Sequence, residues 1–276
     1  MPSRRPLFGC MLLALLVRLA AAADAPAAPD VPVAPDRDIQ LCNGKDLAGF
    51  HTWLKATGRE DPKKVFTVSG GMIHISGVGL GYLATNQAYK DYDLTLEYKW
   101  GKYHESGPSV RNSGLLVHAI GPDGGAAGTF MTCLECQIAQ GCEGDLIVIR
   151  GKDAAGKVIP ATITCETVIA ADGNTRWHKG GTKTVYSGKQ FWWSKHEPFF
   201  KELLDARGKD DVASPLDQWT KIECICRGDR VTIIINGVTV NECFHTFPAA
   251  GKILLEEEGS EIFFRNVVLH PLKKTP

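Results

Sequence analysis

The stretch YDLTLEYKW (92–100) alternates apolar and polar side chains without interruption. Because successive side chains of a β-strand point to opposite faces, this pattern predicts a strand with one buried and one polar face. The buried face carries Tyr92, Leu94, Leu96, Tyr98 and Trp100, and the polar face carries Asp93, Thr95, Glu97 and Lys99. Such a strand requires a sheet with one face covered by other apolar side chains.

Other segments carry related signals. Residues 230–242 place Asn236-Gly237 between β-branched runs, which predicts a type I′ hairpin. Residues 253–271 repeat the pattern, with strands on either side of Gly259-Ser260, and 65–77 predict another hairpin. Single strands are predicted at 113–120 and 219–227. The best helical signal is at 196–208, with Pro198 in the first turn and Gly208 at the end.

Many strands, Gly-rich turns and few helices predict an all-β antiparallel sandwich rather than βαβ units. The chain shows no internal repeat and no second core, which indicates a single large domain. Residues 151–215 resemble long loop insertions between strands, and loops of that length are usually functional.

The N-terminus predicts export. Arg4 and Arg5 precede an apolar run, and Ala21-Ala22-Ala23 offers a cleavage site, so residues 1–23 are interpreted as a signal peptide. Residues 24–37 are rich in Ala and Pro and are expected to form a disordered leader. No later segment is long and apolar enough for a membrane span. We therefore expect a periplasmic or secreted protein.

Charge argues against one class of partner. The chain has 31 basic and 31 acidic residues. Removal of the signal peptide, residues 1–23, takes away three arginines and no acidic residues, which leaves 28 basic residues and a formal charge of −3. The chain therefore lacks the net positive charge with which proteins bind the phosphate backbone of nucleic acids.

Cysteines crowd the segment FMTCLECQIAQGC (130–142). The Cys133-x-x-Cys136 spacing is typical of half a zinc site, and a local disulfide from Cys133 to Cys142 is a second possibility. If TCLECQIA is a strand, however, Cys133 and Cys136 point to opposite faces and cannot hold one metal. The third interpretation is therefore unpaired cysteines beside a functional Glu135. Cys224 and Cys226 share one strand face and are expected to be buried core thiols.

Common catalytic signatures are absent. SGVGLGY (76–82) lacks the helix and lysine of a phosphate loop and is interpreted as a strained turn. The chain contains no G-x-S-x-G elbow and no H-E-x-x-H motif. Trp177, Trp192 and Trp193 lie in loop-like surroundings, where they would either stack on sugar rings or attach the insertion to the sandwich.

An ordered set of segments resembles the 3-keto-disaccharide hydrolase domain family. The set comprises LCNGKDLAGFHTW, GYLATNQAYKDYDLTLEYKW, Asn112-Ser113-Gly114, LECQI, INGVTVNE and GKILLEEEGSEIFFRNVVLHPL. The resemblance runs from about residue 38 to 273. It implies a concanavalin A-like jelly roll of the lectin and glucanase type, with the sugar site on a concave sheet. His118 and Glu256 depart from the family's pattern, which has Arg and Gln there.

The resemblance also implies action on glycosides oxidised at C3. The ketone acidifies the C2 proton, so a base can form an enolate that expels the C1 aglycone before water adds back. This route requires a base, a stabiliser for the enolate oxygen and an acid for the leaving group. Glu135 or His118 is the predicted base, and Lys99, Arg265 or a divalent metal ion is the predicted stabiliser.

The remaining site residues are assigned to substrate or metal. Asn112, Gln137, Arg265 and Glu258 are predicted to bind the glycoside, together with the three tryptophans named above. A divalent metal would act as a Lewis acid, and His118, Glu135 and Glu258 are its candidate ligands.

Two other classes of function fit the same fold. A conventional glycosidase would place two carboxylates across the scissile bond at separations of ~5 to 9.5 Å. The chain offers Glu135 and Glu258 for this role but lacks an E-x-D-x-E strand. A noncatalytic, lectin-like module would need only aromatic and hydrogen-bonding side chains.

Overall fold

The computed structural model describes residues 31–105, 109–186, 190–191 and 203–273. Residues from Val31 onward form one compact unit. Every element of regular structure in the described ranges is a strand, and every pairing between these strands is antiparallel. The described ranges therefore contain no helix capable of crossing a bilayer.

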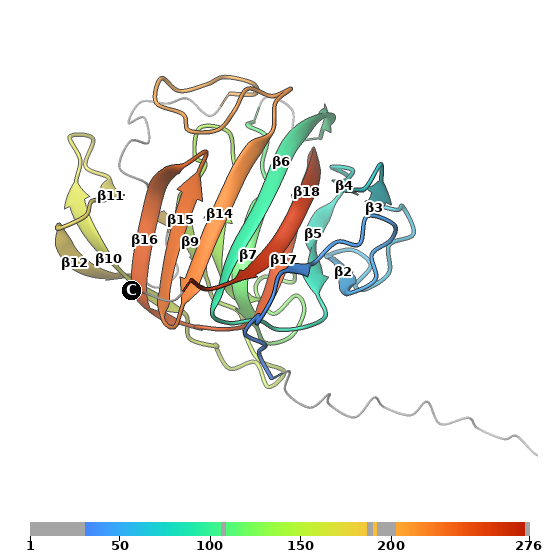
Figure 1. Cartoon of the computed structure of the whole chain (residues 1–276), viewed down its shortest axis with the longest axis horizontal. Coiled ribbons are helices and arrows are strands. Elements are labelled where there is room, and N and C mark those ends of the chain that lie inside the picture. The colour runs from blue at the N-terminus through green and yellow to red at the C-terminus, as the bar shows by residue number, and fades with distance from the viewer. Residues whose placement is uncertain (1–30, 106–108, 187–189, 192–202, 274–276) are drawn as a thin grey trace, which may run out of the picture. The chain divides into compact units, whose positions relative to one another are not determined.

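Two sheets face each other, and Figure 1 shows the larger one in front. The large sheet has eleven strands. In spatial order they are β11 (Thr175–Trp177), β10 (Thr162–Ile169), β16 (Val238–Phe247), β15 (Arg230–Ile235), β14 (Thr220–Arg227), β6 (Tyr92–His104), β18 (Ser260–Pro271), β4 (Met72–Ile75) and β3 (Phe66–Ser69), with β1 (Ile39–Gln40) beside β18 and β12 (Thr182–Tyr186) beside β10.

The small sheet has seven strands. Their order is β13 (Gln190–Phe191), β9 (Leu146–Ile149), β8 (Thr132–Gln137), β7 (Gly114–Ile120), β17 (Lys252–Glu258), β5 (Leu80–Thr85) and β2 (Phe50–Leu54). This all-β arrangement of two antiparallel sheets confirms the predicted fold class.

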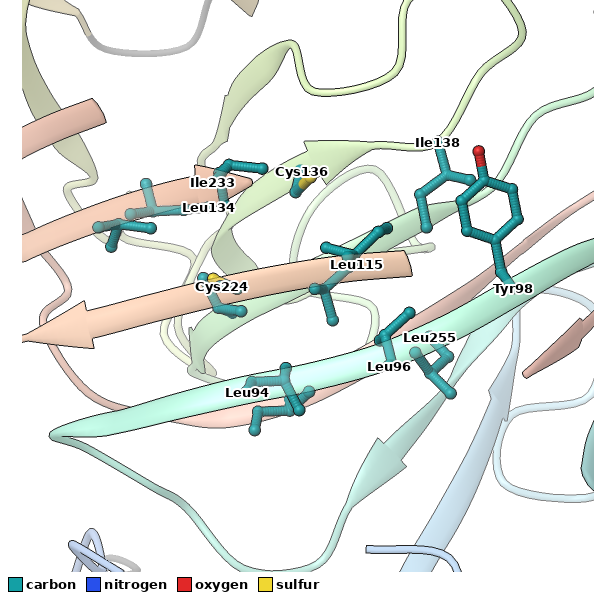
Figure 2. Packing of buried hydrophobic residues seen from close by; sticks show 14 of the residues in the cluster. Leu94, Leu96, Tyr98, Leu115, Leu134, Cys136, Ile138, Cys224, Ile233 and Leu255 are labelled. Carbon is teal, nitrogen blue, oxygen red and sulfur yellow. The ribbon is translucent and has the colours of Figure 1, made fainter. Parts of the chain in front are cut away.

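The core lies between the sheets. The five apolar side chains predicted on the buried face of β6 are at most 7% exposed. Figure 2 shows Leu94 and Leu96 of β6 together with Leu115 of β7, Leu134 of β8 and Leu255 of β17. These residues come from both sheets. The inward-facing side chains of each sheet therefore form one half of a shared core.

The predicted hairpins form. Asn236 and Gly237 both have positive φ, 47° and 81°, as a type I′ turn between β15 and β16 requires. Strands β3 and β4 pair as predicted for residues 65–77. The segment 76–82 is a turn entering β5, with Gly77 at φ 81° and its amide donating to Glu257.

The strands on either side of Gly259 form but do not pair with each other. Strand β17 belongs to the small sheet and β18 to the large sheet, so the chain crosses between sheets at this glycine. Gly259 has φ 79°, and the Glu257 carboxylate accepts the Gly259 amide at 2.9 Å. A buried carboxylate therefore stabilises the crossing.

Two predictions about irregular regions need correction. Residues 151–215 are not only loops, because β10, β11 and β12 form there and extend the large sheet. The β-branched run TITCETVI of β10 provides the strand propensity. Residues 203–208 form an irregular segment with a turn at 204–205 rather than the end of a helix, and residues 192–202 of the predicted helix lie outside the described residues.

Candidate functional site

The opening cysteine segment contains β8, and its side chains alternate as predicted. Cys136 lies in the core between the sheets, whereas Cys133 belongs to a second apolar cluster on the outer face of the small sheet. The two thiols therefore cannot hold one metal. Cys142 lies in a third cluster with Val110 and Ala139, and it forms no disulfide with Cys133.

None of the eight cysteines in the described residues forms a disulfide. Seven are buried, and Cys42 is partly buried. The closest recorded pair, Cys224 and Cys226, has its sulfurs 3.8 Å apart, far beyond the ~2.05 Å of a disulfide. The prediction that Cys224 and Cys226 are buried core thiols is confirmed.

These thiols lead to a first testable prediction. At most one of the eight is expected to react with a thiol reagent in the native protein, because burial blocks the others. All eight are expected to react after unfolding without a reductant. The measurement is a colorimetric thiol titration, and a smaller count in the unfolded protein would reveal a disulfide.

Three glutamates converge on the outer face of the small sheet. Glu135 lies on β8, and Glu256 and Glu258 lie two residues apart on β17. Strand β7 runs between them, with Leu116 paired to Glu135 on one side and to Leu254 on the other. The carboxyl groups therefore have to meet across β7.

Gly114 leaves the space in which they meet. A Cβ atom at this position would lie 2.6 Å from Glu256 Oε2 and 2.9 Å from Glu135 Oε1. Both distances are shorter than van der Waals contact, so any larger residue would push the carboxyl groups apart. A glycine is therefore needed as the third residue of the Asn112-Ser113-Gly114 motif, because any side chain there would clash with the two carboxyl groups.

The carboxyl groups of Glu135 and Glu256 are buried and close together, and both hold a proton more tightly than an ordinary glutamate. Burial and the nearby Glu258 charge raise the pKa of Glu135 to about 8. Burial and the charges of both other glutamates raise the pKa of Glu256 well above its usual range. The hydrogen bond between the pair also raises the pKa of Glu256 and lowers that of Glu135. The Glu256 carboxyl group therefore holds a proton more tightly than the Glu135 carboxyl group does.

Polar residues just before β7 and at the end of β8 surround the glutamates. Asn112 Nδ2 donates a hydrogen bond to Glu258 Oε2, and Ser113 Oγ donates to the Glu256 carbonyl oxygen at 2.9 Å. Burial raises the pKa of Glu258 despite the Asn112 bond. Gln137 Oε1 accepts the Ile138 amide at 2.9 Å. The predicted residues Asn112, Gln137 and Glu258 thus lie at or beside the glutamate cluster.

A second network borders the cluster. Tyr82 of β5 pairs with Glu256 across the sheet, and its hydroxyl donates to Asp123 at 2.8 Å. Asp123 also accepts from Arg59 at 2.7 Å and contacts His51 at 3.1 Å. Although burial opposes ionisation, these bonds lower the pKa of Asp123 below its usual range. The loop after β7 is thereby held to β5 and β2.

Sequence reasoning assigned no role to Glu256, Gly114 or Tyr82. Glu256 was recognised only as a departure from the family's pattern. The sequence pattern that could have identified Glu256 is the run Glu256-Glu257-Glu258 on a strand. Because side chains alternate along a strand, the first and third carboxylates of this run lie on the same face. No sequence pattern predicts that Tyr82 lies beside Glu256, because only the order of strands in the sheet places β5 next to β17.

His118 does not join the cluster. The pairing of β7 with β8 shifts register between Val117 and Ile120, and His118 has φ 56°. This bulge turns the fully buried imidazole into the core, beside Tyr92 and within 3.1 Å of the Pro248 carbonyl oxygen. The sheet separates it from Glu135, so the prediction of His118 as base or shared metal ligand is wrong.

Lys99 and Arg265 lie on the outer face of the large sheet, on the opposite side of the sandwich from Glu135. Arg265 Nε donates to Glu97 Oε2 at 2.8 Å, and its guanidinium lies 3.9 Å from the centre of the Trp219 ring. Lys99 Nζ lies 5.2 Å from the same ring. Neither cation can stabilise an oxyanion at Glu135, because the core lies between them.

The predicted sugar platforms are only partly described. Trp177 is 9% exposed and belongs to the core cluster, which supports its role in attaching the insertion to the sandwich. Trp192 and Trp193 lie outside the described residues.

Within the described ranges, no group of three or more His, Cys, Asp or Glu side chains has a metal-binding arrangement. The candidate set His118, Glu135 and Glu258 does not converge.

The sequence matches the 3-keto-alpha-glucoside-1,2-lyase-like domain over residues 37–270. The chain belongs to this family. The family resemblance predicted from the sequence segments is confirmed, and family membership indicates a carbohydrate-active protein. Among curated proteins, none matches the sequence.

The chain is similar to several solved structures. A candidate glycosyl hydrolase from Parabacteroides distasonis is similar with a TM-score of 0.51 and 17% identity, over 86% of this chain and 94% of that one. A carbohydrate-binding module from Bacillus subtilis has a TM-score of 0.40 and 9% identity, over 80% and 95% of the two chains. The first likeness supports the fold, and the second is too weak to add to the argument.

Proposed function

We propose that this family member is an exported enzyme that cleaves 3-keto-glycosides by elimination. The observation that supports the proposal best is the meeting of the buried Glu135 and Glu256 carboxyl groups at Gly114. A general base works best when its pKa lies near the working pH. Burial supplies that condition for Glu135, and it keeps an acid beside the base.

In the proposed reaction, Glu135 accepts the C2 proton of the sugar. The C2–H electron pair forms an enolate with the C3 ketone. The enolate then forms the C1=C2 double bond as the bond from C1 to the aglycone oxygen breaks. Glu256 donates its proton to that oxygen, and subsequent addition of water to the enone gives the free 3-keto sugar. Gln137 and Asn112 orient sugar hydroxyls beside the carboxyl groups.

A conventional glycosidase is less consistent with this geometry. Its two carboxyl groups stand ~5 to 9.5 Å apart, with the glycosidic bond between them. The Glu135 and Glu256 carboxyl groups instead meet at Gly114, which leaves no room for a sugar between them. Two adjacent carboxyl groups suit proton transfer at neighbouring C2 and leaving-group positions better than attack from opposite faces.

The deciding experiment compares a 3-keto-glucoside with its unoxidised parent, using purified mature protein with and without a chelator. We expect cleavage of the keto sugar alone. Cleavage of both sugars would favour a conventional glycosidase, and binding without cleavage would favour a lectin-like module. Loss of activity with the chelator would place a divalent metal in the reaction. N-terminal sequencing of the exported protein tests cleavage after Ala23.

The activity is expected to depend on pH in a defined direction. Glu135 must be ionised to accept a proton, and its raised pKa delays ionisation to about pH 8. The value of kcat/KM should therefore rise with pH up to that region and fall where Glu256 loses its proton. A pH profile of kcat/KM measures this. A rise centred in the ordinary glutamate range would contradict the proposed base.

A further inference from the structure

A separate cavity lies where one end of the sandwich meets the segment 205–217. Its volume is about 290 Å³, near the lower end of the range of small-molecule pockets. Trp100 of β6 lines one side, Gln140 and Glu143 of the loop after β8 line another, and Arg207 and Asp211 belong to the covering segment. A space of this size suits one small ring rather than an extended chain.

The cavity faces a different way from the glutamate cluster. Trp100 belongs to the core-facing row of β6, and its ring packs edge-on against Tyr98, 5.7 Å away. Glu135 points from β8 to the outer face of the small sheet, away from that core. A ligand in the cavity would therefore approach Trp100 and Glu143 without touching Glu135.

Buried polar groups are directed at this space. Gln140 is 5% exposed, and its Oε1 accepts the amides of Arg111 and Asp205, both at 3.1 Å. This fixes the side chain with its NH₂ group free of any recorded bond within the described residues. Glu143 is 4% exposed and accepts the Gly141 amide at 2.8 Å through Oε2.

Glu143 holds its proton more tightly than an ordinary glutamate. Burial, with the Asp211 charge, raises its pKa to about 8, although hydrogen bonds from its own and the Gly141 backbone amides and the Arg207 charge lower it in part. A neutral carboxylic acid offers both an O–H donor and an acceptor. Asp211 adds an acceptor, Arg207 adds donors, and Trp100 adds an aromatic surface. Donors, acceptors and an aromatic ring around a small space match the hydroxyls and C–H faces of a sugar.

We propose that this cavity binds one neutral hexose unit, at a site separate from the glutamate cluster. Gln140, Glu143 and Arg207 bond its hydroxyl groups, and Trp100 contacts its ring. A sugar held there would keep the protein on a glycan surface while the glutamate cluster acts on another unit. This site does not depend on the proposed elimination.

The test measures binding of methyl α-D-glucopyranoside, an unoxidised sugar, by isothermal titration and by saturation-transfer NMR. We expect binding to the wild type and equal binding to the Glu135→Gln variant. Arg207→Ala should weaken binding about tenfold, the effect of losing one hydrogen bond to a charged group. Ala206→Phe should abolish it, because Ala206 lines the cavity and a ring would fill it.

Asp210→Ala is the matched control, because this exposed neighbour does not line the cavity. It should bind as the wild type does, and thermal unfolding should show that every variant is folded. Absence of binding to the wild type would overturn the proposal. Unchanged affinity in both cavity variants would do the same, as would loss of binding in Glu135→Gln alone, which would place the sugar at the glutamate cluster.

Discussion

Replacement of Glu135 by glutamine is expected to lower kcat/KM for a 3-keto-glucoside about 10²- to 10⁴-fold, the range that a general base contributes. Glutamine has nearly the same shape, so Glu256 can still donate its hydrogen bond. What disappears is the group that accepts the C2 proton. Steady-state kinetics of the purified variant measure the effect.

The same variant should gain stability at alkaline pH. The folded-state pKa of Glu135 lies above the ordinary glutamate value, so the folded protein binds this proton more tightly than the unfolded chain. The free energy of unfolding of the wild type therefore falls as pH rises towards about 8. Glutamine does not titrate, and above this pH the variant should be more stable by a few kcal/mol, on the order that such a shift implies.

Two comparisons separate catalysis from structure. Glu223→Gln alters a carboxylate on the large sheet, where Glu223 pairs with Thr95 and Ile234, and should leave both activity and its pH profile unchanged. Urea unfolding at acidic and alkaline pH gives the stability difference. Full activity in Glu135→Gln would remove this residue from the mechanism, whatever its effect on stability.

Replacement of Gly114 by alanine should impair both the site and the fold. The added Cβ would lie 2.6 Å from Glu256 Oε2 and 2.9 Å from a Leu116 methyl group. Gly114 is not among the glycines with positive φ, so the effect is steric rather than conformational. We expect a loss of about 1–3 kcal/mol of unfolding free energy, as overpacking produces, and a fall in kcat/KM as the carboxyl groups separate.

A double variant tests the stated cause. Glu256→Asp shortens the side chain nearest to the new Cβ, so combining it with Gly114→Ala should recover part of the lost stability without restoring activity. Chemical denaturation and kinetics on both variants provide the measurement. Wild-type activity in Gly114→Ala would show that the carboxyl groups do not need to meet across β7.

The strands could be predicted because alternation is a local property. Residues 92–100, the Asn236-Gly237 turn and the β8 face assignment all follow from side-chain period and turn chemistry, and each is confirmed. The alternation in β8 by itself also places Cys133 and Cys136 on opposite faces, so they cannot share a metal ion. Local patterns were less informative for 151–215, where strands extend a sheet that is built mainly from distant residues.

The candidate site was predictable only in part. The family resemblance identified four residues that lie at or beside the glutamate cluster in the structure, namely Glu135, Asn112, Gln137 and Glu258. His118 was misplaced because a bulge reverses the direction of its side chain, and no local signal marks that bulge. Lys99 and Arg265 were misplaced because strand alternation indicates a polar face without revealing which of two sheets carries it.

By itself, the sequence determined which residues form strands, which side chains of each strand share a face, and which family the chain belongs to. The tertiary structure decided the order of strands in each sheet, and with it the meeting of Glu135 and Glu256 across Gly114. The physical reason is the separation in sequence over which each kind of interaction acts. Backbone geometry and side-chain period act between neighbours in the chain, whereas a pair of buried carboxyl groups depends on contact between strands more than a hundred residues apart.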